Sequence, residues 1–298
     1  MMLRFVLCAG LVLMPSCTLA QNTVLLSNDP GLALEFETGL LWQIDNGVSR
    51  PSYLFGTMHV EDPRITRLPD SVLEVFESSK SLTTEALLDM DQILQVSTEL
   101  LLVDGNRLED LIGAEMFSKV SDAITAQGMT PQIASLLKPW AVAILLATPR
   151  AKSGIFLDRK LYDMAQQRGK ALFGLETLQE QLQVFNAMNL DDQILLLEET
   201  LAQINMIPEM IEQLAQAYLD RDIKRLAELA NEQFSGSRVQ TQLKQQLLID
   251  RNIKMVDRMQ ARIREGGAFI AIGALHLPGP DGLLSLLQQK GYVLTRIY

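Results

Sequence analysis

The order of apolar and polar positions predicts strands near both ends of the chain. Residues 40–45 and 53–60 are apolar runs separated by Asn46-Gly47, a pattern typical of a β-hairpin. A helix is predicted from about residue 68, because Leu68, Val72 and Phe76 recur at helical spacing, with Asp70 or Ser71 at its N-cap. The stretch SLTTE that follows is strand-like and ends at Glu85.

The middle of the chain, about residues 89–265, has mostly helical periodicity. Breaks are expected at Gly113, Gly128 and Pro139. Asp158 is the predicted N-cap of a helix that Gly169 closes, and residues 171–175 then form a strand that leads to Glu176.

The last thirty residues repeat the pattern found near the amino-terminal end. A strand over 268–277 precedes the loop PGPDG, a helix over 283–290 and a strand over 292–298. Strand–helix–strand crossovers favour parallel, neighbouring strands. The predicted fold class is therefore α/β, with a central mixed sheet built from the N- and C-terminal strand–helix–strand units and a large helical insertion.

The first twenty residues have the layout of a secretory signal. One positive charge at Arg4 precedes an apolar run that is too short to span a bilayer, and Ala20 ends a stretch of small residues. We expect cleavage after Ala20, export to the periplasm or the extracellular space, and a single domain over residues 21–298. Lipoprotein anchoring at Cys17 is the less favoured alternative. Cys8 and Cys17 are the only cysteines, so the mature chain would hold no thiol.

Charge and hydropathy narrow the range of partners. The net charge of -10 and the absence of a basic stripe argue against a nucleic-acid partner. No second apolar stretch is long enough for a stable membrane span. The sequence leaves the oligomeric state open.

The chain has two histidines among 298 residues, and each follows a Gly-x-x sequence. Gly56 precedes His59 in FGTMHV, and Gly273 precedes His276 in IGALHL. A glycine at a strand end permits a tight turn or a close approach by another group, so both glycines are expected to line the site. Ligand crevices form beyond the carboxyl ends of such strands. Each histidine alone is more often a turn or core residue, but the matched pair favours a shared functional site.

Carboxylates that could join the histidines must also lie at strand ends. Glu85 and Glu176 each end an apolar, strand-like stretch, whereas Glu61 and Asp62 are less well placed. Two imidazoles with a carboxylate form sites for zinc, iron, manganese or cobalt. The residue types therefore predict a divalent-metal site at His59, His276, Glu85 and Glu176.

The two Gly-x-x-His motifs, with FLDRKLYDMAQQRGKALFGLETLQEQL and LIDRNIKMVDRM between them, resemble the TraB/PrgY/GumN family, whose animal relatives include the Tiki proteases. The resemblance covers about residues 40–298. It implies divalent-metal-dependent hydrolysis, with peptide or protein substrates in Tiki-like members and manganese or cobalt as the usual metal. The family's positions fall on Gly56, His59, Glu85, Glu176, Arg251, Asn252, Gly273 and His276.

A hydrolytic mechanism follows from these residues as a hypothesis. Both histidines and one of Glu85 or Glu176 would hold the metal, and the other glutamate would act as general base. Arg251 would stabilise an oxyanion or bind a substrate carboxylate, or else would be a surface charge paired with Asp250 or Asp257. The alternative functions are non-catalytic binding of a metal or haem, and sequestration of a peptide.

Overall fold

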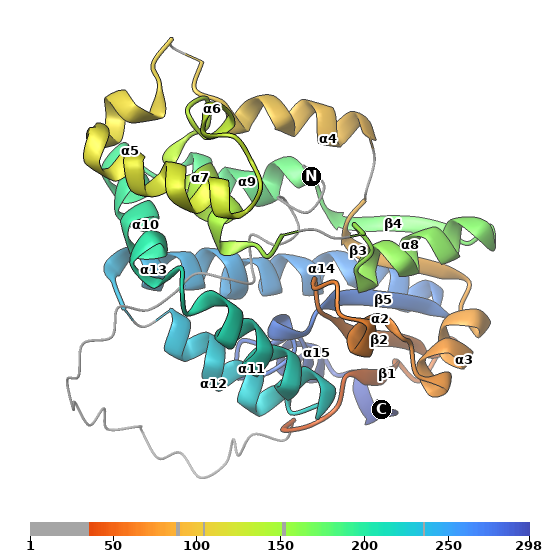
Figure 1. Cartoon of the computed structure of the whole chain (residues 1–298). Coiled ribbons are helices and arrows are strands. Elements are labelled where there is room, and N and C mark those ends of the chain that lie inside the picture. Colours follow the sequence, from red (N-terminus) through yellow and green to blue (C-terminus); the bar gives the residue numbers. More distant parts are fainter. Residues whose placement is uncertain (1–35, 88–89, 104, 151–152, 235) are drawn as a thin grey trace, which may run out of the picture.

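A six-stranded mixed sheet forms the centre of the protein in the computed structural model (Figure 1). The structure describes residues 36–87, 90–103, 105–150, 153–234 and 236–298, so the predicted signal segment with Cys8 and Cys17 lies outside the described residues. The strand order is β4-β3-β5-β2-β1-β6. The strands are β1 (Leu41–Asp45), β2 (Ser52–Thr57), β3 (Ser81–Ala86), β4 (Ala171–Glu176), β5 (Ala268–Gly273) and β6 (Val293–Arg296).

The strand directions confirm the mixed α/β fold. β1 and β2 form the predicted antiparallel hairpin, with Leu41 opposite Phe55. The pairs β2–β5, β5–β3 and β3–β4 are parallel, while β6 is antiparallel to β1. The carboxyl ends of β2, β3, β4 and β5 therefore lie at the same edge of the sheet.

The expectation that each strand–helix–strand unit contributes neighbouring strands is wrong. β5 lies between β2 and β3, while β2 and β1 separate β5 from β6. A physical reason is that all six residues of β5 are buried, and such an apolar strand is stable at the sheet centre. The two terminal units thus interleave within one sheet, which places the two Gly-x-x-His strands side by side.

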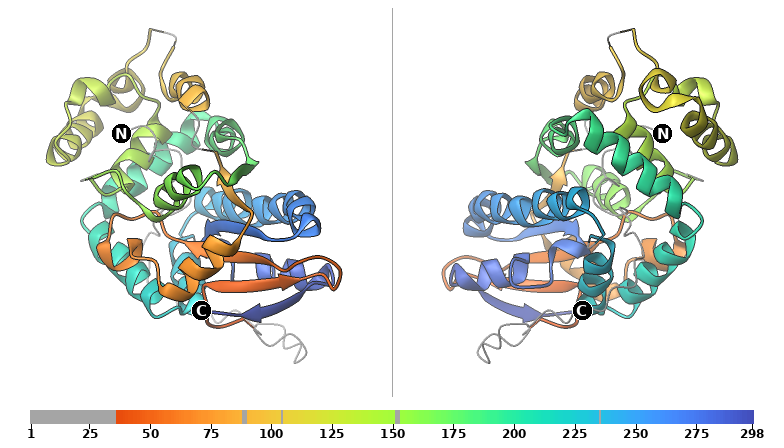
Figure 2. Two further views of the ribbon diagram at one scale, coloured as in Figure 1. Left: turned by 90° about the vertical axis from the view of Figure 1, so that its right-hand side faces the viewer. Right: turned by 90° about the vertical axis from the view of Figure 1, so that its left-hand side faces the viewer.

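Helices cover both faces of the sheet (Figure 2). One face carries α2 (Pro63–Thr66), α3 (Asp70–Ser78) and α8 (Leu157–Gln167), and the other carries α14 (Asp250–Glu265) and α15 (Leu283–Gln289). The N-cap of α3 is Pro69 rather than Asp70 or Ser71. Pro69 has the extended backbone of a cap, which places Asp70 in the first turn, where its charge favours the helix dipole. Gly169, with a φ of 63°, follows the end of α8 as predicted.

A second hydrophobic core lies among the helices above the sheet. Trp140 stacks on Phe185 within this core, and α7 is buried at all nine positions, which explains why it shows no amphipathic pattern. The predicted breaks at Gly113, Gly128 and Pro139 are confirmed as a kink, a helix end and a helix start. The elements of this layer are α4 (Met90–Ser97), η2 (Thr98–Leu100), α5 (Leu108–Ala126), α6 (Pro131–Ala134), α7 (Pro139–Ala147), α9 (Leu178–Asn186), α10 (Leu190–Gln203) and α13 (Arg238–Lys244).

The remaining elements connect this layer to the sheet. α11 (Ile207–Leu219) and α12 (Ile223–Gln233) pack on the sheet core, and a π-helical turn, η3 (Gln245–Ile249), leads into α14. A short 3-10 helix, η4 (Ala274–His276), follows β5 directly. Among the residues that the structure describes, no helix is both long enough and apolar enough to cross a membrane.

Candidate functional site

The two histidines follow adjacent parallel strands at the same edge of the sheet. Thr57, the last residue of β2, pairs in register with Gly273, the last residue of β5. His59 lies two residues beyond β2, and His276 ends η4, three residues beyond β5. Both side chains are buried, with 5% and 4% of their surfaces exposed. The sequence prediction that both histidines lie beyond neighbouring strand ends therefore agrees with this geometry.

Each glycine of the two motifs makes room for a neighbouring group. A Cβ atom at Gly56 would lie 2.7 Å from Leu277 Cδ1 and 3.1 Å from Ala274 Cβ. A Cβ atom at Gly273 would lie 3.1 Å from Glu85 Oε1. Neither glycine has a positive φ, so close approach, and not a special turn, requires them. The groups that approach are the chain's own side chains and η4.

Glu85 lies beside His276 at the end of β3. Its Oε1 accepts a hydrogen bond of 2.8 Å from the Gly273 amide and lies 3.9 Å from His276 Nε2. Burial disfavours the charged carboxylate, but the positive charge of Arg251, with smaller contributions from the two imidazoles and the Gly273 amide, outweighs it and lowers the pKa of Glu85 to about 2. Glu85 is therefore ionised at neutral pH.

Arg251 joins the two predicted glutamates. It lies in the first turn of α14, where its Nη2 contacts Glu85 Oε2 at 2.6 Å and its Nε donates to Glu176 Oε2 at 2.9 Å. Gln181 Nε2 donates to both carboxylates, at 3.5 and 3.4 Å. Arg251 is only 6% exposed, and despite its burial the two carboxylates raise its pKa. The alternative of a surface charge paired with Asp250 or Asp257 is wrong.

Asn252 orients the ring of His276. The amide Nδ2 of Asn252 donates to the Asp281 carbonyl at 2.8 Å, so its Oδ1 faces His276 Nδ1 at 2.6 Å. A carbonyl oxygen only accepts hydrogen bonds, so His276 carries its proton on Nδ1 and directs the Nε2 lone pair toward Glu85. Burial lowers the pKa of His276 to about 3, and the neighbouring Arg251 and His59 act in the same direction. The charge of Glu85 acts in the opposite direction but does not outweigh them. His276 is therefore neutral at physiological pH.

His59 contacts Asp158, which the sequence pattern predicts to be the N-cap of a helix. Its Nε2 lies 3.0 Å from Asp158 Oδ2, while Asp158 Oδ1 accepts a hydrogen bond of 2.8 Å from Thr57 Oγ1. The prediction that Asp158 is an N-cap is wrong, because Phe156 caps α8 and Asp158 lies buried in its first turn. The segment that begins FLDRKL, which carries part of the family resemblance, is the one sequence signal of a site role for Asp158.

The other two carboxylates near His59 have structural roles. Glu61 accepts hydrogen bonds from the Ser153 and Gly154 amides. Asp62 caps α2 and pairs with Arg64. Both therefore hold the segment that follows His59.

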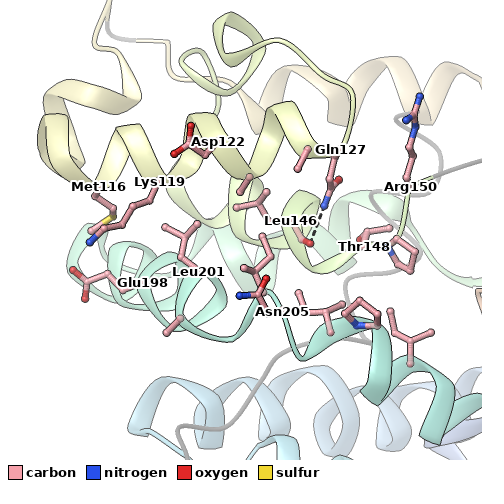
Figure 3. Close-up of a pocket in the computed structure, with 18 of the residues that line it drawn as sticks. Met116, Lys119, Asp122, Gln127, Leu146, Thr148, Arg150, Glu198, Leu201 and Asn205 are labelled. Carbon is pink, nitrogen blue, oxygen red and sulfur yellow. Dashed lines mark hydrogen bonds between the residues drawn. The ribbon is translucent and has the colours of Figure 1, made fainter.

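A large cavity lies between α5 and the junction of α10 with α11 (Figure 3). It has a volume of about 1210 Å³ and a mainly apolar lining that includes Met116, Leu146 and Leu201. At one end it reaches Arg150, shortly before the Ser153 and Gly154 amides that hold Glu61. It also reaches α11, which packs against α2. None of the described residues that line the cavity belongs to the site at the strand ends.

A family model matches most of the chain. The model of the TraB/PrgY/gumN family matches residues 40–296, which include both histidines, both glutamates and Arg251. The chain belongs to the TraB/PrgY/gumN family. It is 25% identical to metalloprotease TIKI2 of Danio rerio over 81% of this chain and 57% of that protein. It is 24% identical to metalloprotease TIKI1 of Homo sapiens over 85% of this chain and 60% of that protein. No solved structure matches the chain significantly.

The chain therefore spans somewhat more than half the length of these TraB/PrgY/gumN relatives, which are named as metalloproteases.

The donor types at the strand ends fit a divalent metal, because neutral His276 directs Nε2 toward ionised Glu85 and Asn252 holds the other ring nitrogen. In the described part of the chain, no three His, Cys, Asp or Glu side chains already form a metal-binding group.

Proposed function

We propose that this chain is an exported divalent-metal-dependent hydrolase, and specifically a peptidase, whose site lies beyond the carboxyl ends of β2, β3, β4 and β5. The observation that carries the proposal is the pairing of β2 with β5, since it brings both Gly-x-x-His motifs to one edge beside Glu85. The metalloprotease names of the relatives support the same reaction class.

In this proposal, His59, His276 and Glu85 hold the metal. Glu85 fits the ligand role better than Glu176, because its Oε1 lies 3.9 Å from His276 Nε2 whereas Glu176 lies beyond Arg251. A divalent ion supplies Lewis acidity, which polarises a carbonyl and makes a water molecule more acidic. Manganese and cobalt are the metals to test first.

The second glutamate is the candidate general base. Arg251 and Gln181 both contact Glu176 through Oε2, so Oε1 is the atom at which Glu176 would accept a proton. Arg251 would hold both carboxylates in place and keep Glu85 ionised as a ligand. This role replaces the oxyanion role, because the Arg251 guanidinium already contacts Glu85, Glu176 and the Leu247 carbonyl.

The proposed substrate is a polypeptide. The cavity between α5 and α11 exceeds the roughly 300–1,000 Å³ of a typical small-molecule site, and its apolar lining suits side chains of an extended chain. Its end near Arg150 and α11 would lead such a chain toward His59. Sequestration of a peptide without cleavage uses the same cavity and is the second candidate function.

Cleavage of a peptide library by the metal-free protein and by protein loaded with Mn²⁺ or Co²⁺ tests the enzyme. Metal-dependent products that His276→Ala abolishes are expected. The matched control is Gln260→Ala, a change on the outer face of α14 away from the site. If loaded wild-type protein binds peptides from the library but cleaves none, the peptidase proposal fails and sequestration is favoured. A Soret absorbance band on purified protein would favour the haem alternative.

A further inference from the structure

The carbonyl of Gly56, in the first Gly-x-x-His motif, has a side-chain partner where a strand partner would be expected. The Gly56 amide donates to the Leu40 carbonyl at 2.8 Å, as in an antiparallel pair that exchanges two hydrogen bonds. The Leu40 amide, however, donates to the Tyr298 carbonyl at 2.6 Å rather than back to Gly56. The hydroxyl of Tyr218 donates to the Gly56 carbonyl instead, at 2.8 Å. Tyr218 thus completes the hydrogen bonding of β2 one residue before the strand ends.

Tyr218 comes from helix α11 and is buried. It is 5% exposed, and it lies 162 positions from Gly56 in the sequence. Burial raises the pKa of Tyr218 well above its ordinary value, and the neighbouring Asp158 and Tyr298 act in the same direction. The hydroxyl therefore stays protonated and remains a hydrogen-bond donor across the physiological pH range.

The same side chain lies where the two motifs meet. Tyr218 lines a small internal space of about 10 Å³ together with the residues that stand between glycine and histidine in both motifs. These residues are Thr57 and Met58 in the first motif and Ala274 and Leu275 in the second. A space of this size holds nothing larger than a water molecule, so both motifs pack closely against α11.

We propose that Tyr218 is a positioning residue for the site: it fixes the end of β2 beside η4 and so sets where His59 lies relative to His276. His59 follows Gly56 by three residues, so a shift of the Gly56 carbonyl moves the backbone that carries this imidazole. A tyrosine with only a structural role would stabilise the fold without changing the placement of either imidazole. The ligand role of both histidines rests on the proposed function, whereas the placement of their rings in the metal-free protein does not.

Tyr218→Phe removes one oxygen atom and keeps the ring, so the packing around the small space is retained. Tyr162→Phe is the matched control, because the Tyr162 hydroxyl accepts a hydrogen bond from Gln166 on the exposed side of α8. Urea denaturation shows whether both variants fold. If Tyr218→Phe unfolds in buffer, sucrose favours its folded state, and the measurements are made in sucrose. Failure to fold even then would overturn the positioning role in favour of a structural one.

The two rings can be observed separately in the metal-free protein, because the full chain contains only two histidines. Two-dimensional ¹H–¹³C spectra give one ring signal for each, and His276→Gln assigns them. We expect the His59 signal of Tyr218→Phe to double or broaden, because the segment after Gly56 then exchanges between positions. Tyr162→Phe should keep the wild-type signals. Single, sharp signals at the wild-type positions for both rings of Tyr218→Phe would overturn the proposal.

Metal affinity separates this inference from the proposed function. If the wild-type protein binds Co²⁺, Tyr218→Phe should weaken the affinity about tenfold, the lower end of the range for groups that hold metal ligands in place. The visible absorption spectrum of the bound Co²⁺ should change as well, because it reports the coordination geometry. Unchanged affinity and spectrum in the folded variant would overturn the positioning role and leave the proposed function intact. If the wild-type protein binds neither Co²⁺ nor Mn²⁺, the proposed function fails, and the ring signals alone decide the role of Tyr218.

Discussion

At the scale of single residues, the site depends on one buried positive charge between two buried carboxylates. Arg251, Glu85 and Glu176 are each less than a tenth exposed, and each needs the others to offset its loss of hydration. The guanidinium contacts both carboxylates through its Nε and Nη2 atoms, a geometry that a lysine ammonium cannot reproduce.

Arg251→Met is expected to destabilise the protein by about 3–5 kcal/mol, because it leaves two buried carboxylates without their cation. Urea denaturation at neutral pH measures the change. Arg225→Met is the control, since Arg225 pairs with Glu228 and Glu232 at the surface and should change stability by less than about 1 kcal/mol. Equal effects of the two substitutions would show that the Arg251 cluster is not a stabilising element.

His276 gives the metal-free protein a pH-dependent stability. Its folded pKa of about 3 lies below its ordinary value of 6.5, so the unfolded chain takes up the proton first as the pH falls. The stability is therefore present above pH 6.5 and is lost toward pH 3, with a limiting slope of about 1.4 kcal/mol per pH unit. Denaturation of wild-type protein and of His276→Asn at pH 7, 6 and 5 measures it. The variant should show a flatter profile, and an unchanged slope would contradict this assignment.

The individual site residues differ in how far sequence could predict them. His59 and His276 were predictable because histidine is rare here and both follow Gly-x-x. The contact of Asp158 with His59 was not predictable, because it joins residues 99 positions apart. In addition, an aspartate near the start of a helix is ordinarily a cap. The pairing of Arg251 with Glu85 and Glu176 likewise depends on how α14 packs on the sheet.

At the scale of elements, the contact of β2 with η4 sets the spacing of the site. Gly56 lies in β2 directly beneath Ala274 and Leu277, so η4 can approach the strand closely and place His276 beside Glu85. The element types near both ends were predictable from periodicity. The insertion of β5 between β2 and β3 was not, because local patterns specify strands but not their long-range partners.

Gly56→Ala is expected to cost about 1–3 kcal/mol, because the new methyl group would lie 2.7 Å from Leu277 Cδ1 and force η4 away. Chemical denaturation measures the loss. Leu277→Ala removes the closest atom, so the double variant should be more stable than the sum of the two single changes predicts. Strict additivity would show that the contact between Gly56 and Leu277 does not cause the loss.

At the scale of the whole molecule, the sheet holds the candidate chemistry and the helical layer holds the cavity. The cavity lies among α5, α10 and α11, and α11 also packs on α2. The helical composition of the middle was predictable, but the cavity was not, because it forms between helices that are far apart in the sequence.

Ala202→Trp tests whether substrates use this cavity. Ala202 lines the cavity and is exposed, so the indole would fill space without disturbing a core. Under the proposed function, KM for peptide cleavage should rise about tenfold or more with little change in kcat. Ala114→Trp, at an exposed alanine of α5 that does not line the cavity, is the control. Equal KM values in both variants would place the substrate elsewhere.

The central claim is that His59 and His276 belong to one metal-binding site. The most direct measurement is metal stoichiometry after loading with Mn²⁺ and dialysis, for wild-type protein, His59→Ala and His276→Ala. We predict about one ion per chain in the wild type and loss of that ion in each single variant, because removing either imidazole from a three-ligand set leaves an incomplete site. An undiminished metal content in either folded variant would contradict the claim.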